Sequence, residues 1–257
     1  MERLLEGKTA VITGARRGIG LATLKLFAEN GASVWAIIRS EDREWLEATA
    51  QLSSAYNVFI KPVYADISDS TSLKAAVKEI FADKLPVDIL VNAAGVTSPD
   101  RSFAMTPLED IKKLFNTNFF GALELSQLVL RKMMRRGSGS IINVTSIAAF
   151  GEDTSQLEYA ASKAALECAT EKMAAEVSPF GIRVNSVAPG WTATDMTRNF
   201  ETSSYAKIEK GLPMGRFAKP EEIAQGILFL ASEKASFISG SCLRIDGGAF
   251  KLKNFIG

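Results

Sequence analysis

Three side chains in the second half of the chain could together transfer a proton at neutral pH. Tyr159 and Lys163 lie four positions apart in the segment YAASKAA, and Ser146 precedes Tyr159 by thirteen positions. A spacing of four puts Tyr159 and Lys163 on one face of a helix, where both can serve one ligand. The chain has no histidine. Tyr/Lys pairs at this spacing are also common on solvated helix faces, so the pair indicates chemistry only when other residues join it.

A glycine-rich turn near the N-terminus is typical of a phosphate site. TGARRGIG, residues 13–20, follows an apolar run and opens a helical pattern. Gly14, Gly18 and Gly20 let the backbone approach a phosphate, for which a helix N-terminus supplies free N–H groups and partial positive charge. The GxxxGxG spacing departs from the GxGxxG dinucleotide fingerprint, so by itself the turn is equally compatible with a tight strand–helix connection.

Strands and helices must alternate to position these residues. Seven short β-branched runs predict strands, at residues 9–14, 32–38, 58–65, 87–95, 140–146, 182–190 and 242–248. Longer helical patterns lie between them, such as 20–31, where Asn30-Gly31 predicts a helix end. This alternation predicts an α/β fold: one Rossmann-type doubly wound domain over residues 1–257, with a seven-stranded parallel sheet and helices on both faces.

One segment is too long for a simple connection. Residues 191–217 separate the sixth predicted strand from a helix that starts near Pro220. The segment predicts either a lid over a ligand or a surface excursion.

Composition narrows the class of protein. The chain has 257 residues, 47% hydrophobic and 23% charged, with a net charge of +1. This balance favours neither a nucleic acid nor a membrane surface as a partner. Cys168 and Cys242 form no disulfide framework and have no metal-ligand spacing, so we expect no metal. Because the first residues also lack the pattern of a signal peptide, we expect a cytoplasmic protein.

The motifs, in their order and spacing, resemble the short-chain dehydrogenase/reductase family. They are the glycine turn, NAAG at 92–95, Asn118, Ser146, Tyr159 with Lys163, and PGWTAT at 189–194. The resemblance runs from residue 7 to about residue 250. Within the family, SVAPGWTATDMT and ISGSCLRIDGGAF are most similar to bacterial 3-oxoacyl-[acyl-carrier-protein] reductases. The resemblance implies hydride transfer between a nicotinamide cofactor and a carbonyl or secondary alcohol. It also implies that the protein is a homotetramer.

The resemblance also implies a role for each catalytic residue. Tyr159 would give its proton to the carbonyl oxygen, and Ser146 would hold that oxygen by a hydrogen bond. Lys163 would bond the nicotinamide ribose and lower the pKa of the tyrosine. Asn118 would anchor a water that links Lys163 to solvent; Asn116 is the rival, but only Asn118 has the following Gly121 at the family's spacing.

Cofactor choice follows from the end of the second predicted strand. NAD enzymes of this fold usually have a carboxylate there, which bonds the ribose 2′-hydroxyl and repels a 2′-phosphate. Ile38 holds that place, Arg39 follows it, and Arg17 lies in the glycine turn. Two guanidinium groups could grip a phosphate, so we expect NADP rather than NAD. The alternative is that Arg39 simply ends a strand in solvent.

Further cofactor contacts follow from the resemblance. Asp66 matches the residue that bonds the adenine, although it could equally be a turn aspartate. The contacts around NAAG are largely made by backbone atoms, so Ala93 in place of a second asparagine should matter little. The complete expected set is Gly14, Arg17, Gly18, Ile19, Gly20, Arg39, Asp66, Ile67, Asn92, Ala93, Gly95, Tyr159, Lys163, Pro189, Gly190, Thr192 and Thr194.

The substrate is the least determined feature. Phe150, Trp191, Met196 and Phe200 form an apolar set that suits an acyl chain, a ring or a small ketone. Two arginine positions that carrier-protein reductases use near the site mouth are Gly137 and Phe180 here, with Arg135 and Arg136 beside the first. Glu152 and Asp153 would repel an anionic thioester arm.

Several functions therefore stay open. The first is an NADPH-dependent reductase of a 3-oxoacyl thioester, with an acyl carrier protein as a candidate partner. The alternative within the same chemistry is a dehydrogenase of a sugar, a steroid or a small cyclic ketone or alcohol. The glycine spacing and the chain length disfavour a sugar epimerase or dehydratase. A cofactor-binding protein without catalysis predicts a broken Ser-Tyr-Lys set, and the set is intact.

Overall fold

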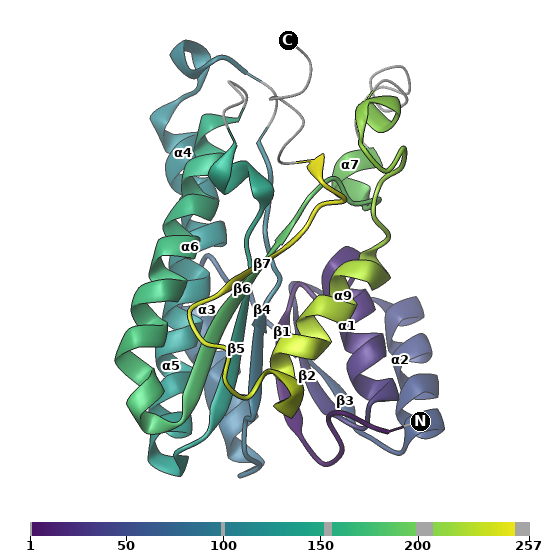
Figure 1. Ribbon diagram of the computed structural model, residues 1–257. Helices are drawn as coiled ribbons and strands as arrows, with labels where there is room; N and C mark the ends of the chain where they lie inside the picture. Colours follow the sequence, from purple (N-terminus) through teal and green to yellow (C-terminus); the bar gives the residue numbers. More distant parts are fainter. Residues whose placement is uncertain (1, 99–100, 152–155, 199–207, 250–257) are drawn as a thin grey trace.

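Seven parallel strands form one sheet at the centre of the molecule (Figure 1). The computed structural model describes residues 2–98, 101–151, 156–198 and 208–249. The strands are β1 (Thr9–Thr13), β2 (Ser33–Ile38), β3 (Ile60–Tyr64), β4 (Ile89–Asn92), β5 (Gly139–Val144), β6 (Ile182–Pro189) and β7 (Cys242–Ile245). Their spatial order is β3-β2-β1-β4-β5-β6-β7, and every neighbouring pair is parallel. The predicted doubly wound sheet is confirmed.

Helices cover both faces of the sheet (Figure 1). One face carries α1 (Gly18–Glu29), α2 (Arg43–Tyr56) and α9 (Pro220–Ala231). The other carries α3 (Ser70–Ala82), α4 (Leu108–Phe115), α5 (Gly121–Arg136) and α6 (Leu157–Val177). Short helical turns are η1 (Phe103–Met105), η2 (Asn116–Phe120), η3 (Ile147–Phe150), η4 (Ser178–Phe180), η5 (Glu233–Ala235) and α7 (Asp195–Arg198). No helix in the described ranges combines the length and the apolar character that a membrane span requires.

The core has two halves because successive strand residues point to opposite faces of a sheet. In β1, Ala10 and Ile12 pack with α1, α2 and α9, whereas Val11 between them packs with α3 and α5. Both faces are covered, so the strands are apolar without alternation, as parallel strands in α/β proteins are.

The predicted end of the first helix is confirmed, and the structure adds a cap at the start of the second. Asn30 is the C-terminal cap of α1, and Gly31 follows with a φ of +86°. Asp42 caps the start of α2 by accepting a hydrogen bond from the Trp45 backbone N–H. Such caps satisfy backbone groups that a helix end leaves without partners.

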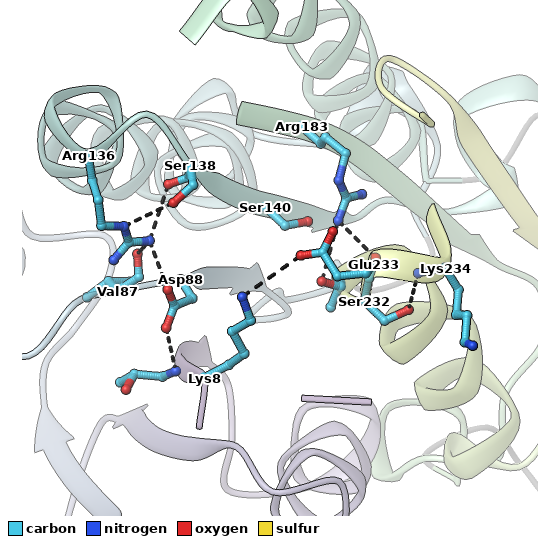
Figure 2. A network of polar contacts seen from close by, with 12 residues as sticks. Lys8, Val87, Asp88, Arg136, Ser138, Ser140, Arg183, Ser232, Glu233 and Lys234 are labelled. Atoms are coloured by element: carbon cyan, nitrogen blue, oxygen red, sulfur yellow. Dashed lines mark hydrogen bonds and ion pairs between the residues drawn. The ribbon is translucent and has the colours of Figure 1, made fainter. Parts of the chain in front are cut away.

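A polar network ties together the amino ends of the strands (Figure 2). Asp88, just before β4, accepts from the Thr9 backbone N–H at 2.8 Å and pairs with Arg136 at 2.9 Å. Arg183 in β6 donates to the Leu230 carbonyl at the end of α9, at 2.7 Å. This edge of the sheet is therefore occupied by contacts that hold the fold together.

The opposite edge holds the topological switch point. β1 lies between β2 and β4, so the chain turns to opposite sides of the sheet after β1 and after β4. Ligands of open α/β sheets bind at the carboxyl ends of strands, where such a reversal leaves a crevice. The glycine turn follows β1 and NAAG includes the end of β4.

Candidate active site

Ser146, Tyr159 and Lys163 come together at the carboxyl end of β5. Ser146 caps the start of η3 just after the strand, with its hydroxyl accepting from the Ala148 backbone N–H at 3.2 Å. Its hydroxyl also hydrogen bonds with the Tyr159 phenol. The Lys163 ammonium lies 5.9 Å from the centroid of the Tyr159 ring and donates to the Val144 carbonyl oxygen at 2.8 Å. The expected cluster is thus assembled by one strand end and one helix.

Burial controls the protonation of this cluster. It raises the pKa of Tyr159 above its ordinary value of 10.0, and the Ser146 hydrogen bond opposes that shift. Burial lowers the pKa of Lys163 from 10.5 to about 8. In the protein without a cofactor, the expected lowering of the tyrosine pKa by Lys163 therefore does not prevail over burial. Desolvation of the phenol outweighs the ammonium, which is hydrogen bonded to a backbone carbonyl.

Asn118 connects the cluster to the loop after β4. Its amide oxygen accepts from the Val96 backbone N–H at 2.8 Å. Its amide nitrogen donates to the Val96 carbonyl at 2.9 Å and to the Ser162 hydroxyl at 3.2 Å. Ser162 in turn donates to the Tyr159 carbonyl at 2.8 Å. The sequence analysis did not predict a role for Ser162. A serine within a helix, one position before Lys163, has no pattern that would indicate one.

A π-helical turn brings Asn118 inward. Residues 116–120 form η2, between α4 and α5, in which Asn118 is buried and Asn116 is exposed. Such turns shift the register of a helix and are frequent at functional sites. A Cβ atom at Gly95 would lie 3.3 Å from the Lys163 nitrogen and 3.4 Å from the Asn118 amide oxygen. The structure therefore brings Asn118, and not Asn116, towards Lys163.

The glycine turn has the shape of a nucleotide cradle. Gly14 and Gly18 have φ values of +66° and +56°, which side-chain-bearing residues rarely adopt. A Cβ at Gly14 would lie 2.8 Å from the Cα of Ala94, so the turn lies directly against the loop after β4. The first turn of α1 has neither a side-chain cap nor an acidic residue. These features leave the helix N-terminus suited to a phosphate.

Thr13 holds the two loops of the cradle together. Its hydroxyl accepts from the backbone N–H groups of Ala93 and Ala94, at 3.1 and 3.0 Å. The hydroxyl is at the end of β1 and the two amides follow β4, so the contact closes the switch point. Sequence reasoning passed over Thr13 because a threonine within a strand is ordinary.

Three arginines near the cradle have different surroundings. Arg17 forms an ion pair with Asp195 of α7 at 3.4 Å. Arg16 forms one with Asp42 at 2.8 Å. Arg39 is exposed directly after β2 and acts electrostatically on Asp66, whose pKa is lowered mainly by hydrogen bonds from Ser68. The two arginines that were expected to grip one phosphate thus include one, Arg17, that faces α7.

Three expected cofactor residues have visible local contacts. Asp66 accepts from the backbone N–H and the hydroxyl of Ser68, at 2.9 and 2.7 Å, as a turn aspartate does. Asn92 is buried, and its amide nitrogen donates to Asn143 at 2.8 Å and to Ser126 at 3.0 Å. Because this side chain points into the interior, any cofactor contact of Asn92 must come from its backbone. Ile67 is buried, and its carbonyl oxygen lies against Gly121.

The segment after β6 covers the glycine turn. The Thr194 methyl lies 3.4 Å from where a Cβ of Gly18 would be. Ala193 and Ala218 join the two ends of the 191–217 excursion, by a 2.8 Å hydrogen bond from the Ala193 N–H to the Ala218 carbonyl. Gly190, at the base, packs closely against Asp246. The start of the excursion thus lies against the glycine turn, and its two ends lie side by side.

Only part of the apolar substrate set can be placed. Trp191 packs against the buried Phe217, with ring centroids 5.9 Å apart. Phe150 lies in η3, next to Ser146, with the Arg244 guanidinium 5.3 Å from its ring centroid. The side chain of Met196, and residues Phe200, Glu152 and Asp153, lie outside the described part of the chain.

The two positions matched to carrier-binding arginines lie away from this site. Gly137 follows α5 and precedes β5, and Phe180 in η4 precedes β6, so both are at the amino ends of the strands. Arg136 beside Gly137 is engaged with Asp88 in the network of Figure 2. Within one chain these two positions do not border Ser146, because Ser146 lies at the opposite end of β5.

Known proteins are similar to this chain over almost its whole length. Residues 14–249 match the family model described as "Enoyl-(Acyl carrier protein) reductase". The chain is 37% identical over 244 residues to 3-oxoacyl-[acyl-carrier-protein] reductase FabG of Thermotoga maritima, covering 95% of this chain and 98% of the relative. It is 35% identical over 250 residues to 3alpha-hydroxysteroid dehydrogenase of Mediterraneibacter gnavus, covering 97% and 99%.

Solved structures of dehydrogenases are also similar to this chain over almost its whole length. A short-chain type dehydrogenase/reductase from Mycobacterium marinum superposes with a TM-score of 0.88 at 32% identity, covering 95% of this chain and 96% of that one. A protein from Beutenbergia cavernae, described as a "putative NAD(P) dependent gluconate 5-dehydrogenase" with bound NADP at low occupancy, gives a TM-score of 0.90 at 31% identity, covering 98% of this chain and 100% of that one.

Proposed function

The chain belongs to the short-chain dehydrogenase/reductase family, and from this premise we propose that it reduces the keto group of a 3-oxoacyl thioester with NADPH. It is an oxidoreductase that transfers hydride between a nicotinamide cofactor and a carbonyl or alcohol carbon. The observation that carries the proposal is the grouping of Ser146, Tyr159 and Lys163 at the carboxyl end of β5.

In this mechanism Tyr159 is the acid. A bound nicotinamide cofactor supplies the hydride in the reductive direction and carries a positive ring once oxidised. Tyr159 gives its phenol proton to the carbonyl oxygen as charge develops there, and the Ser146 hydroxyl hydrogen bonds to the same oxygen. A positioned donor of this kind stabilises the transition state more than the ground state. The raised pKa of Tyr159 keeps the phenol protonated at neutral pH, which suits reduction.

Lys163 and Asn118 return a proton to Tyr159 after it has given its own to the substrate. The pKa of about 8 makes the Lys163 ammonium a ready proton donor near neutral pH. Its nitrogen and the Asn118 amide oxygen both approach Gly95, as the spacing around a Cβ at that position indicates. We assign to Asn118 the anchoring of a water there, and to Lys163 a second task, the binding of the nicotinamide ribose.

The cradle would hold the dinucleotide along the carboxyl edge of the sheet. The glycine turn and the start of α1 suit the pyrophosphate. Backbone atoms of Ala93 and Gly95, the first residues after Pro189, and Asp66 with Ile67 would line the remainder. The cofactor preference for NADP over NAD is supported by Ile38 at the end of β2, where an acid would repel a 2′-phosphate, and by the exposed Arg39 beside it.

The acyl thioester is supported by the relatives and by the partly apolar surroundings of Ser146. Relatives named 3-oxoacyl-[acyl-carrier-protein] reductase cover 95% or more of the chain. Phe150 in η3 and Trp191 just after β6 are partly exposed aromatic residues that follow two neighbouring strands. A steroid is the second candidate, because the hydroxysteroid dehydrogenase of Mediterraneibacter gnavus is nearly as similar as these reductases. An acyl carrier protein as the physiological partner belongs to the first candidate alone.

A direct assay separates the candidates. NADPH oxidation is followed with acetoacetyl thioesters of coenzyme A and of a carrier protein, with a 3-ketosteroid, with cyclic ketones and with keto sugars. We expect the highest kcat/KM with an acetoacetyl thioester. A higher value with the ketosteroid would overturn the substrate assignment and leave the reaction class intact.

The single domain, the lid function of residues 191–217, the cytoplasmic location and the homotetramer are parts of the same proposal. The ion pair between Arg17 and Asp195 supports a lid that meets the cofactor site. For the assembly, exposed apolar residues on η1 and α4, such as Phe103, Met105 and Leu108, support contact with another copy. Light scattering should give the mass of four chains; a monomer at all concentrations would contradict this part.

A further inference from the structure

Two consecutive arginines of the glycine turn reach towards opposite neighbours. Arg17 pairs with Asp195 of α7 at 3.4 Å, on the side of the excursion. Arg16 pairs with Asp42 at 2.8 Å, in the loop between β2 and α2. This loop begins with Arg39 at the end of β2. Arg16 therefore points to the side of the sheet where the adenosine ribose of a dinucleotide belongs in this type of fold.

Asp42 supplies a negative charge in the same loop as Arg39. It is three residues after Arg39, its side chain is 23% exposed, and the Trp45 backbone N–H and Arg16 hold its pKa below the ordinary 3.8. The carboxylate is thus ionised at neutral pH. An acid beside the adenosine ribose favours NAD, because it bonds the ribose hydroxyls and repels a phosphate.

The position of Asp42 is constrained by α2. The Trp45 indole N–H donates to the Ala15 carbonyl of the glycine turn at 3.0 Å, and Trp45 is 5% exposed. One oxygen of Asp42 accepts from the Trp45 backbone N–H at 3.2 Å, which leaves the other for Arg16. Since the start of α2 is fastened to the glycine turn, Asp42 cannot turn away from the site without losing its capping contact.

We propose that the Arg16–Asp42 ion pair determines the preference for a 2′-phosphate: Arg16 is a positioning residue that neutralises the fixed carboxylate of Asp42, so that it does not repel the phosphate. This inference rests on the proposed function, because it assumes a nicotinamide dinucleotide in the cradle. Arg16 acts through Asp42, whereas Arg39 is the group proposed to touch the phosphate. Without Arg16, Asp42 would be the free acid that marks an NAD site.

A double-mutant cycle tests the proposal by binding. Dissociation constants are measured for NADPH and NADH, and for the fragments adenosine 2′,5′-bisphosphate and adenosine 5′-monophosphate. The variants are Arg16→Ala, Arg16→Lys, Asp42→Asn and Arg16→Ala with Asp42→Asn. Asparagine is also a good helix cap, so Asp42→Asn should keep the start of α2. Arg43→Ala is the matched control, because Arg43 pairs with Glu47 within the same helix at 3.0 Å.

Arg16→Ala should weaken NADPH and the bisphosphate about 5- to 10-fold, with NADH and the monophosphate nearly unchanged. Adding Asp42→Asn should restore most of the loss, since the unneutralised acid is then absent, and Arg16→Lys should retain most of the preference. Arg43→Ala should leave the ratio of the two affinities unchanged.

Two results would overturn the inference while leaving the proposed function in place. One is an unchanged NADPH/NADH ratio in Arg16→Ala. The other is a loss that persists fully in the Asp42→Asn background, which would mean that Arg16 contacts the phosphate itself. If the wild-type chain bound NADPH no more tightly than NADH, the proposed cofactor preference would fail first, and the inference with it.

Discussion

The Lys163 ammonium lies 5.9 Å from the centre of the Tyr159 ring, within the range of a cation–π interaction. Lys163 is 4% exposed and its nitrogen donates to a backbone carbonyl. Charge on either residue therefore changes the cost of charge on the other, in surroundings with little water. Proton transfer in a chain without histidine depends on this pair.

Tyr159→Phe should remove reduction and preserve cofactor binding. The substitution deletes one hydroxyl and keeps the ring against Lys163. Loss of a general acid usually costs 100- to 10,000-fold, so we expect a fall of at least about 100-fold in kcat. NADPH affinity, measured by titration of cofactor fluorescence, should change less than about twofold.

The matched control for that substitution is Tyr64→Phe, at an exposed position in β3. It should leave both kcat and NADPH affinity unchanged. If Tyr159→Phe kept more than a few per cent of wild-type turnover on a good substrate, the proton would come from another group, and the site assignment would fail.

The ionisation of Tyr159 should depend on the cofactor. Burial raises the phenol pKa above 10.0 in the protein itself, so absorbance titration without cofactor should show its ionisation above that value. With the oxidised cofactor, two positive groups lie near the phenol, and alcohol oxidation should rise with pH through an ionisation well below 10. Difference spectra against Tyr159→Phe isolate the signal. An oxidation profile that rises only above pH 10 would contradict this prediction.

Lys163→Met should stabilise the protein at pH 7 when no cofactor is added. A pKa of about 8 in place of 10.5 means that burial of the charge costs about 3 kcal/mol. Loss of the hydrogen bond to Val144 offsets about 1 kcal/mol of the gain. For a chain of this size, the remaining 2 kcal/mol raises Tm by roughly 4 to 8 °C in calorimetry.

The pH dependence of that gain has a definite sign. Below pH 8 Lys163 is charged in both the folded and the unfolded states, so the full cost is present. Between pH 8 and 10.5 the unfolded state binds more protons, and the stability of the wild type relative to Lys163→Met rises. The advantage of the variant should therefore shrink over that interval. Lys172→Met, at an exposed position of α6, is the control and should show no such trend.

Arg39→Ala should weaken NADPH roughly 10- to 100-fold and leave NADH nearly unchanged. A charge-assisted contact to a phosphate contributes about 1.5 to 3 kcal/mol, and NADH lacks that phosphate. Isothermal titration with both cofactors measures the effect, with Arg135→Ala at the exposed end of α5 as the control. Equal weakening of NADPH and NADH would place Arg39 on a part common to both cofactors.

Local patterns in the sequence determined most of the fold. Each of the seven β-branched runs forms a strand, and Asn30-Gly31 ends α1. Both features could be predicted because the residue pattern of a strand and the turn residues at a helix end are local in the sequence. The family resemblance carried by the motif order also pointed to Ser146, Tyr159 and Lys163, and the spacing of four predicted that Tyr159 and Lys163 share one helix face.

Only the tertiary structure decided the contacts between distant segments. Arg16 meets Asp42 and Arg17 meets Asp195, although the two arginines are adjacent in the chain. Gly137 precedes β5 and Phe180 precedes β6, whereas Ser146 follows β5. Gly137 and Phe180 therefore lie at the amino ends of the strands, opposite to Ser146. The direction of the Tyr159 pKa shift also depends on burial by several elements, and no spacing along the chain encodes desolvation.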